Sequence, residues 1–259
     1  MAALAVSIFE DEQDNLHIQA LYSSHLDAEM ARNQLGDLRK LEHFITQLPD
    51  EDWIAKSQAG LPPVKAGRFW VYGSHDSGKI PDEVPWPIKI DAGAAFGTGH
   101  HGTTKGCLLI FDDLLHSGFH PTRILDLGCG AGTLAIAAAK ALSTEIRASD
   151  IDADAVSVTQ QNAEINDVGN LINAFQADGL EDIPKPKFDL IFANILAGPL
   201  VGLAPDIFKV MALNSHVILS GILDEQVSNV SRVFHEQGLK IQAYPSLSGW
   251  TSLLGIKPG

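Results

Sequence analysis

The pattern of apolar and polar positions divides this chain into two parts. After residue 123, short apolar runs alternate with longer segments in which apolar residues recur at helical spacing. Before residue 48, the pattern predicts only two strands, 3–9 and 16–22, and one helical region, 27–47. Two strands and one helix cannot close a core by themselves, so we expect this small unit to pack on the rest or to be the remnant of a larger domain.

Beyond residue 123, the alternation of strands and helices predicts a parallel α/β sheet. The predicted strands are 123–127, 145–150, 171–176, 188–194 and 216–221, followed by two strands joined by a turn in 240–256. The predicted helices are 133–142, 152–167, 198–212 and 224–238. A strand hairpin as the last element is unusual for a dinucleotide-binding fold.

The segment between these two parts is rich in proline. One strand is predicted at 68–74, and the remainder up to 87–93 is predicted to be loop and turn. Asp50 is expected to cap a short connecting helix. The predicted domains are a small domain 1–48, a linker helix 49–62 and a larger domain 63–259. Flexibility is expected in the linker helix and in 61–90.

Composition and charge exclude several classes of protein. Hydrophobic residues make up 45% of the chain and charged residues 19%, which is ordinary for a globular protein. No apolar run approaches the roughly 20 residues that a membrane helix needs. The formal net charge of −14 disfavours direct binding to nucleic acid and favours a basic partner.

Cysteine content and the amino-terminal residues indicate a cellular compartment. Cys107 and Cys129 are too few for a disulfide framework or a cysteine zinc site, which indicates a reducing environment. The first residues show no basic stretch ahead of the apolar one, so we expect no cleaved signal peptide. We therefore expect a cytoplasmic protein that is not attached to a membrane, and we take a monomer as the expected state.

The strongest candidate for a binding site is ILDLGCGAGTLAIA, residues 124–137, in which a strand runs into a glycine-rich turn that opens a helix. Gly128 and Gly130 would let the backbone approach a ligand closely, and Gly132 would permit tight packing at the helix start. The spacing is G-x-G-x-G, and Thr133 stands where the dinucleotide fingerprint has a small residue.

Asp150 ends the next strand, roughly 20 residues after the glycine turn, where a carboxylate can accept hydrogen bonds from both ribose hydroxyls. Its alternative role is the N-cap of the following helix, which Asp152 could fill instead. The turn and the acid together indicate an adenosine-type nucleotide. They do not separate a nicotinamide dinucleotide from S-adenosylmethionine.

Two further polar residues follow later strands. Asn194 ends the strand 188–194, where its carbonyl could accept a hydrogen bond from a substrate amine and hold the amine lone pair toward an electrophile. The alternative for Asn194 is a helix cap. Asp178 follows the third strand and could accept from an adenine amino group, or it could simply make a turn with Gly179.

With DAGAAFGTGHHGTTKGC in front and ANILAGPL behind, this arrangement resembles a seven-stranded S-adenosylmethionine-dependent methyltransferase. It is most similar to the PrmA family, which methylates the eleventh protein of the large ribosomal subunit. The similarity covers roughly residues 50–259. The family pattern F-G-T-G-x-H-x-T-T is met by Phe96, Gly97, Thr98, Gly99, His101, Thr103 and Thr104.

This resemblance implies an α/β fold, with a seven-stranded Rossmann-like methyltransferase sheet that ends in an antiparallel hairpin. The amino-terminal domain of the family is ferredoxin-like and docks the ribosomal substrate. The corresponding part of this chain is short, as if its first strand and helix were missing. The implied substrate-recognition domain is therefore a shortened ferredoxin-like α/β unit.

The resemblance also implies a cofactor, S-adenosyl-L-methionine, and the residues around it. The loop FGTGHHGTT would cover the methionine part, with Phe96 walling the reaction pocket. The residues expected to bind the cofactor are Thr104, Asp126, Gly128, Gly130, Asp150, Ile151, Asp178 and Asn194. The expected catalytic residues are Asn194, Phe96 and His101. His100 and His101 lack neighbouring ligands at metal spacing, so no metal is expected.

The implied reaction is methylation of lysine side chains and α-amino groups on a basic ribosomal protein. Four other functions stay open at this point. They are a nicotinamide oxidoreductase, a nucleic-acid amino-methyltransferase, a non-catalytic ribosome-assembly binder, and a methylase of another protein such as an electron-transfer flavoprotein. The hairpin and Asn194 stand against the first, and Ile195 and Leu196, in place of Pro-Pro and an aromatic, stand against the second.

Overall fold

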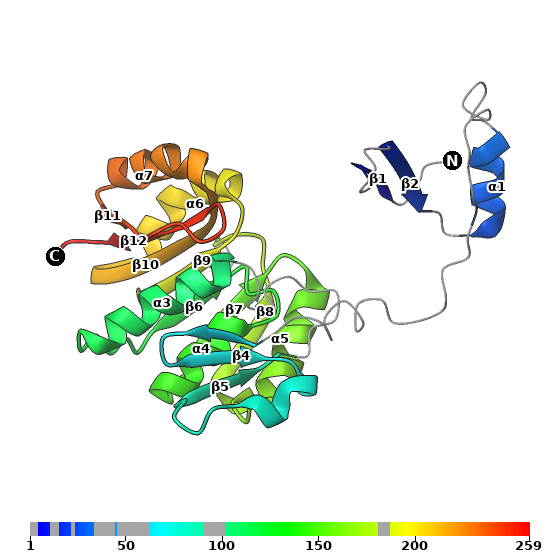
Figure 1. Ribbon diagram of the computed structural model, residues 1–259. Coiled ribbons are helices and arrows are strands. Elements are labelled where there is room, and N and C mark those ends of the chain that lie inside the picture. The colour runs from blue at the N-terminus through cyan, green and yellow to red at the C-terminus, as the bar shows by residue number, and fades with distance from the viewer. Residues whose placement is uncertain are drawn as a thin grey trace. The chain divides into compact units, whose positions relative to one another are not determined.

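A computed structural model of the chain describes residues 5–10, 16–21, 24–33, 45, 63–90, 102–180 and 187–259. The chain divides into two compact units, residues 1–52 and residues 53–259, whose elements are drawn in Figure 1. The predicted linker helix at 49–62 lies outside the described residues.

The amino-terminal unit contains a two-stranded antiparallel sheet and a helix. Strands β1 (Ala5–Glu10) and β2 (Leu16–Leu21) pair so that Ala5 lies opposite Leu21, which confirms the two predicted strands. Helix α1 (His25–Asn33) begins after Ser24, whose Oγ accepts a hydrogen bond from Asp27 N at 3.1 Å. The predicted helical region beyond Asn33 lies almost entirely outside the described residues.

The larger unit is built on a seven-stranded sheet in the order β11-β12-β10-β9-β6-β7-β8. Its strands are β6 (Ile124–Leu127), β7 (Ile146–Asp150), β8 (Ile172–Gln176), β9 (Phe188–Asn194), β10 (Met211–Leu223), β11 (Lys240–Ala243) and β12 (Trp250–Ile256). The five strands from β6 to β10 run parallel, whereas β12 is antiparallel to both of its neighbours. The predicted seven-stranded sheet with a carboxy-terminal hairpin is confirmed.

Helices cover both faces of this sheet (Figure 1). Helices α3 (Gly102–His116), α4 (Thr133–Leu142) and α5 (Ala153–Ile165) lie on one face, and α6 (Ala197–Val210) and α7 (Val227–Glu236) lie on the other. The central strands are buried on both sides: Ile124 packs with the first set of helices and the adjacent Leu125 with the second. This double burial explains the continuous apolar runs from which the parallel strands were predicted.

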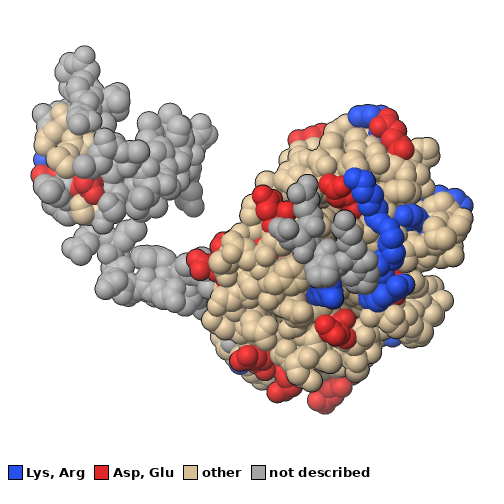
Figure 2. Space-filling view, turned by 180° about the vertical axis from the view of Figure 1, so that it is seen from behind, with Lys and Arg blue, Asp and Glu red and all other residues tan. Residues whose placement is uncertain are grey.

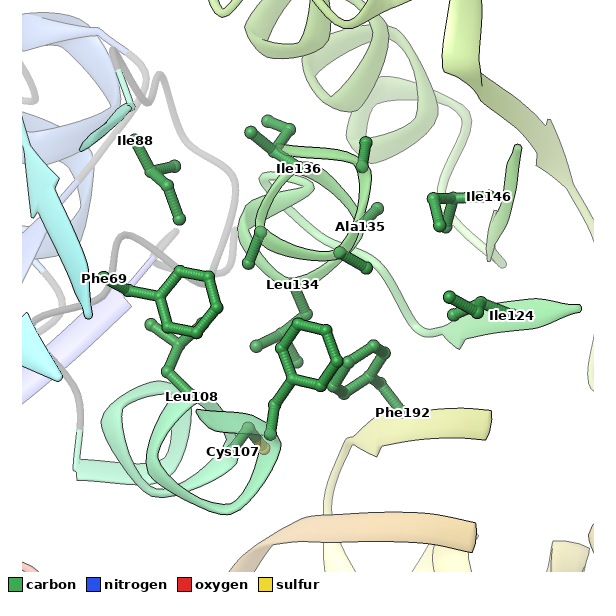
Figure 3. Packing of buried hydrophobic residues seen from close by; sticks show 14 of the residues in the cluster. Phe69, Ile88, Cys107, Leu108, Ile124, Leu134, Ala135, Ile136, Ile146 and Phe192 are labelled. Carbon is green, nitrogen blue, oxygen red and sulfur yellow. The ribbon is translucent and has the colours of Figure 1, made fainter. Parts of the chain in front are cut away.

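A second sheet packs outside α3 and α4. Its strands are β3 (Val64–Ala66), β4 (Phe69–Tyr72) and β5 (Trp86–Lys89), with β4 antiparallel to β3 and parallel to β5. A line of aromatic rings joins it to the main sheet: Phe69 stacks on Phe111 of α3, and Phe111 meets Phe192 of β9 edge to face. Figure 3 shows Phe69 and Ile88 of the outer sheet in the same core as Phe192.

Two predictions for the larger unit are wrong. The strand predicted at 68–74 is confirmed as β4, but residues 64–66, predicted as loop, form β3, which is packed into the core together with β5. The flexibility expected for 61–90 stays a prediction. Strand β3 has only three residues and β5 contains Pro87, so neither shows a clear strand pattern in the sequence. The helix predicted at 198–212 ends at Val210, because Met211 already pairs with Phe188 at the start of a long β10.

The side chain of Asn166, the residue directly after α5, ties the outer sheet to the main unit. The amide of Asn166, directly after α5, accepts from Lys89 N at 2.9 Å and donates to Lys89 O at 2.6 Å, so it pairs with the last residue of β5 as a neighbouring strand would. This bond anchors the chain just before residues 91–101, which lie outside the described residues. Among the described helices, none is long and apolar enough to cross a membrane.

Candidate active site

The glycine turn after β6 lies at the centre of the sheet, where β6 has β7 on one side and β9 on the other. In open α/β sheets this switch point forms a crevice at the carboxyl ends of the strands. Gly128, Gly130 and Gly132 all have positive φ angles, of 73°, 55° and 80°, which only glycine adopts without strain. Gly128 N and Cys129 N both donate to Ser149 O of β7, which holds the turn against the neighbouring strand.

Helix α5 supports the same turn from its far side. Thr159 Oγ1 donates to Gly130 O at 2.9 Å, and Asn162 Nδ2 donates to Ala131 O at 2.9 Å. Both side chains are buried, so these carbonyls depend on them in place of water. Thr159 and Asn162 were not among the predicted site residues. A signal was present, because these polar residues share a helix face with the apolar Ala155 and Ala163.

Asp150 stands at the end of β7 beside the turn. Its Oδ2 accepts from Gly130 N at 2.9 Å and its Oδ1 accepts from Asp152 N at 3.1 Å. Asp152 is the N-cap of α5 and accepts from Asp154 N at 2.9 Å. The capping role considered for Asp150 therefore belongs to Asp152, and the Asp150 carboxylate is left at the crevice with further lone pairs available.

Asp126 lies beneath the turn and is 1% exposed. Its carboxylate accepts from Ala135 N at 3.0 Å, in the first turn of α4. Burial raises the pKa of Asp126 to about 7, and repulsion from Asp150 adds to the rise, while the bond from Ala135 N opposes it. Asp126 therefore holds the start of α4 to β6 from within the core.

Asn194 is the last residue of β9, the strand that pairs with β6 on the side away from β7. Its Nδ2 donates to Thr104 Oγ1 at 3.3 Å, which links the strand end to the first turn of α3. In the described part of the chain, Asn194 Oδ1 is buried and receives no hydrogen bond. Helix α6 has Leu196 as its N-cap residue without a side-chain cap, so Asn194 does not serve as a helix cap.

Ile195, which follows Asn194, is packed between two glycines. A Cβ on Gly128 would lie 2.3 Å from Ile195 Cγ2, and a Cβ on Gly221 would lie 2.2 Å from Ile195 O. Both glycines have positive φ angles. The backbone around Asn194 is therefore held between the glycine turn and the end of β10.

The remaining predicted site residues are either exposed or lie outside the described residues. Ile151, after Asp150, is 64% exposed although it is apolar, and Asp178 is exposed before Gly179, which has a φ of 69°. Phe96, His100 and His101 lie outside the described residues. Helix α3 begins at Gly102, so Thr103 and Thr104 lie in its first turn. Within the described ranges, no cluster of His, Cys, Asp or Glu side chains could hold a metal ion.

This geometry fits an adenosine-type cofactor, with a glycine cradle, an acidic residue on the next strand and an amide across the crevice. The chain matches the family model "Ribosomal protein L11 methyltransferase (PrmA)" over residues 5–258. The chain belongs to this family. It is accordingly an S-adenosylmethionine-dependent methyltransferase, and neither hydride transfer nor a purely non-catalytic role is favoured.

Individual relatives agree with the family assignment. A ribosomal protein L11 methyltransferase of Rhodopseudomonas palustris (strain BisB5) is 44% identical over 225 residues, covering 86% of this chain and 76% of that protein. One of Brucella suis (strain ATCC 23445 / NCTC 10510) is 42% identical over 253 residues, covering 96% of this chain and 88% of its own length. The crystal structure of a ribosomal protein L11 methylase from Lactobacillus delbrueckii subsp. bulgaricus matches with a TM-score of 0.67 and 25% identity, covering 76% of this chain and 99% of that one.

The raised pKa of Asp126 makes a prediction for folding stability. Its native pKa, about 7, lies above the unfolded value near 3.9, so the native state binds more protons than the unfolded state between these pH values. The wild-type protein should therefore lose stability as pH rises from 4 to about 7, on the order of a few kcal/mol. Asp126→Asn cannot ionise and should gain stability relative to wild type from pH 5 to pH 8, as measured by urea unfolding without cofactor. Asp154→Asn, on the exposed start of α5, is the control; a stability difference that stays constant with pH would contradict the prediction.

Proposed function

We propose that this enzyme transfers methyl groups from S-adenosylmethionine to lysine side chains and the α-amino group of ribosomal protein L11. The observation that carries the proposal is the geometry of Asn194. Its amide nitrogen is bonded to Thr104, and its buried oxygen faces no donor within the described residues. A buried acceptor without a donor is costly, so a ligand that donates an N–H at this point would be stabilised.

The cofactor is proposed to lie across the carboxyl ends of β6, β7 and β8. Asp150 would accept from the ribose hydroxyls, and the turn from Gly128 to Gly132 would allow close approach of the backbone. Ile151, exposed and apolar, would lie against the adenine, with Asp178 accepting from its amino group. Asp126 would support this turn from below, and Thr104 would bond the methionine part. When bound, the cofactor supplies an electrophilic methyl group on a sulfonium.

The chain's own part in the chemistry is to bind and orient a neutral amine. Asn194 Oδ1 would accept one N–H, so that the nitrogen lone pair points at the methyl group. A lysine amine has an ordinary pKa near 10.4, and transfer from water into a partly buried site beside a cation lowers that pKa. No general base is required, because alignment of the reacting atoms supplies most of the acceleration. The family resemblance adds Phe96 as a wall of the pocket and His101 as a further catalytic residue.

The amino-terminal unit is proposed to dock the basic substrate. Residues 1–62 carry eleven acidic and four basic residues, so their net charge is 4 − 11 = −7. This is half of the chain's net charge of −14, in less than a quarter of its length. The acidic residues are Glu10, Asp11, Glu12, Asp14, Asp27, Glu29, Asp37, Glu42, Asp50, Glu51 and Asp52, and the basic ones are Arg32, Arg39, Lys40 and Lys56. By contrast, Figure 2 shows basic side chains gathered along one side of the larger unit. We propose a cytoplasmic monomer that meets this protein substrate without direct contact to nucleic acid or membrane.

The test of the substrate is mass spectrometry of unmethylated large-subunit ribosomal proteins after incubation with the enzyme and S-adenosylmethionine. We expect methyl additions confined to L11, on lysines and on the α-amino group. The Asn194→Ala enzyme is the control for background methylation. Absence of additions to L11 from an enzyme that binds S-adenosylmethionine would overturn the proposed substrate and would direct the search to other proteins.

Asn194→Ala should separate cofactor binding from turnover. Removing the amide takes away the acceptor for the amine but leaves the glycine turn and Asp150 in place, so cofactor affinity should change little. Turnover should fall by roughly 10²-fold or more, because a misaligned nucleophile loses most of the gain from positioning. The measurement is kcat at saturating cofactor, with affinity from calorimetry; unchanged kcat would refute this role.

Asp150→Ala should weaken cofactor binding, in contrast to Asn194→Ala, which should lower turnover. It removes the acceptor for the ribose hydroxyls, together with the bonds from Gly130 N and Asp152 N. We expect cofactor affinity to fall by about tenfold to a hundredfold, as for the loss of a charged hydrogen-bond partner. Asp154→Ala on the exposed start of α5 is the matched control. Calorimetry that gives equal affinities for the two variants would count against the role of Asp150.

A further inference from the structure

A second residue at the carboxyl edge of the sheet lies beside Asn194 and has no role in the proposed chemistry. Ser220 of β10 is paired with Asn194 of β9 in the parallel register, so the two side chains stand on neighbouring strand ends. The Ser220 side chain is completely buried, and it is therefore not a group that meets solvent or substrate. Its contacts lead instead to the helix that carries Thr104.

The hydrogen bonds of Ser220 have a fixed direction. Its Oγ lies 3.1 Å from Thr103 O and 2.8 Å from Ser252 Oγ of β12. A carbonyl only accepts, and a serine hydroxyl has one proton, so Ser220 donates to Thr103 O and accepts from Ser252. Strands β10 and β12 are thus joined to helix α3 through two hydroxyl groups that are buried from water.

The first turn of α3 is consequently attached to two adjacent strand ends. Ser220 holds the carbonyl of Thr103, and Asn194 holds the hydroxyl of the next residue, Thr104. Thr103 and Thr104 are each 1% exposed. Because the two bonds join consecutive residues to consecutive strands, displacement of Thr103 also displaces Thr104.

Glycines make this close attachment possible. A Cβ on Gly106 would lie 2.2 Å from Ser252 Oγ, and a Cβ on Gly102 would lie 2.4 Å from Leu247 O in the turn before β12. Helix α3 is therefore seated directly on the carboxy-terminal hairpin. The bond from Asn194 to Thr104 is long, at 3.3 Å, so a small shift of the helix would break it and leave the Asn194 amide free to rotate.

We propose that Ser220 is a positioning residue for methyl transfer, which holds the first turn of α3 where Thr104 fixes the amide of Asn194. This inference rests on the proposed role of Asn194. It assigns a function to the carboxy-terminal hairpin as well, since Ser252 of β12 completes the hydroxyl chain. The hairpin thereby supports the amine-binding group from behind.

The test compares Ser220→Ala with Ser215→Ala. Ser215 lies on the same strand, is 1% exposed and donates to a backbone carbonyl, Ala212 O, at 2.6 Å, but far along β10 from Asn194. Both variants should lose similar thermal stability. Only Ser220→Ala should lower kcat, by about tenfold at saturating cofactor. It should also weaken S-adenosylmethionine binding a few-fold, through Thr104. Ser252→Ala keeps the bond from Ser220 to Thr103 O but removes the hydroxyl that donates to Ser220, so it should lower kcat less than Ser220→Ala does.

A double-mutant cycle decides whether Ser220 acts through Asn194. In the Asn194→Ala background, Ser220→Ala should cause no further loss of kcat, because the group that it positions is absent. Equal losses in both backgrounds, or a kcat and a cofactor affinity for Ser220→Ala that match those of Ser215→Ala, would overturn the inference. If the wild-type enzyme does not methylate L11, the proposed substrate fails, and the cofactor affinities of the two serine variants still test the positioning role.

Discussion

The close approach of Ile195 to Gly128 and Gly221 is the constraint on which the arrangement of the active site depends. A methyl group on either glycine would overlap Ile195, at 2.3 Å from its side chain or 2.2 Å from its carbonyl oxygen. The backbone of the glycine turn, the end of β9 and the end of β10 can thus meet at one point. The glycine turn and the strand end that carries Asn194 are therefore held next to each other, which is the arrangement that the proposed methyl transfer needs.

Hydrogen bonds from buried polar side chains fix the neighbouring elements relative to this contact. Thr159 and Asn162 bond the carbonyls of the glycine turn, and Asn166, one helical turn later, bonds both backbone groups of Lys89. On the other side, Ser220 donates to Thr103 O at the start of α3 and accepts from Ser252 of β12. Residues 91–101 therefore connect two anchored points, β5 and α3. Because unpaired polar groups are costly in the core, each of these bonds specifies one relative position of the elements it joins.

Much of the fold could be predicted because parallel strands in an α/β protein are buried on both faces. That burial leaves uninterrupted apolar runs such as 124–127 and 188–194, separated by amphipathic helices. In the outer sheet only β4 could be predicted in this way. Strands β3 and β5 have three and four residues, and only their contact with α3 and α4 identifies them as core elements.

The sequence alone determined which chemistry to look for, because glycine at left-handed positions, an acid at the end of the next strand and an amide at the end of β9 are requirements of residue type. It could not determine what surrounds them. The alternative capping roles of Asp150 and Asn194 were settled only by their hydrogen bonds in the folded chain. The raised pKa of Asp126 depends on its burial and on Asp150, which is 24 positions away in the chain. Ser220 bonds the carbonyl of Thr103, which is 117 positions away. Burial and register bring these groups together, and both arise from tertiary packing, which no local pattern of residues records.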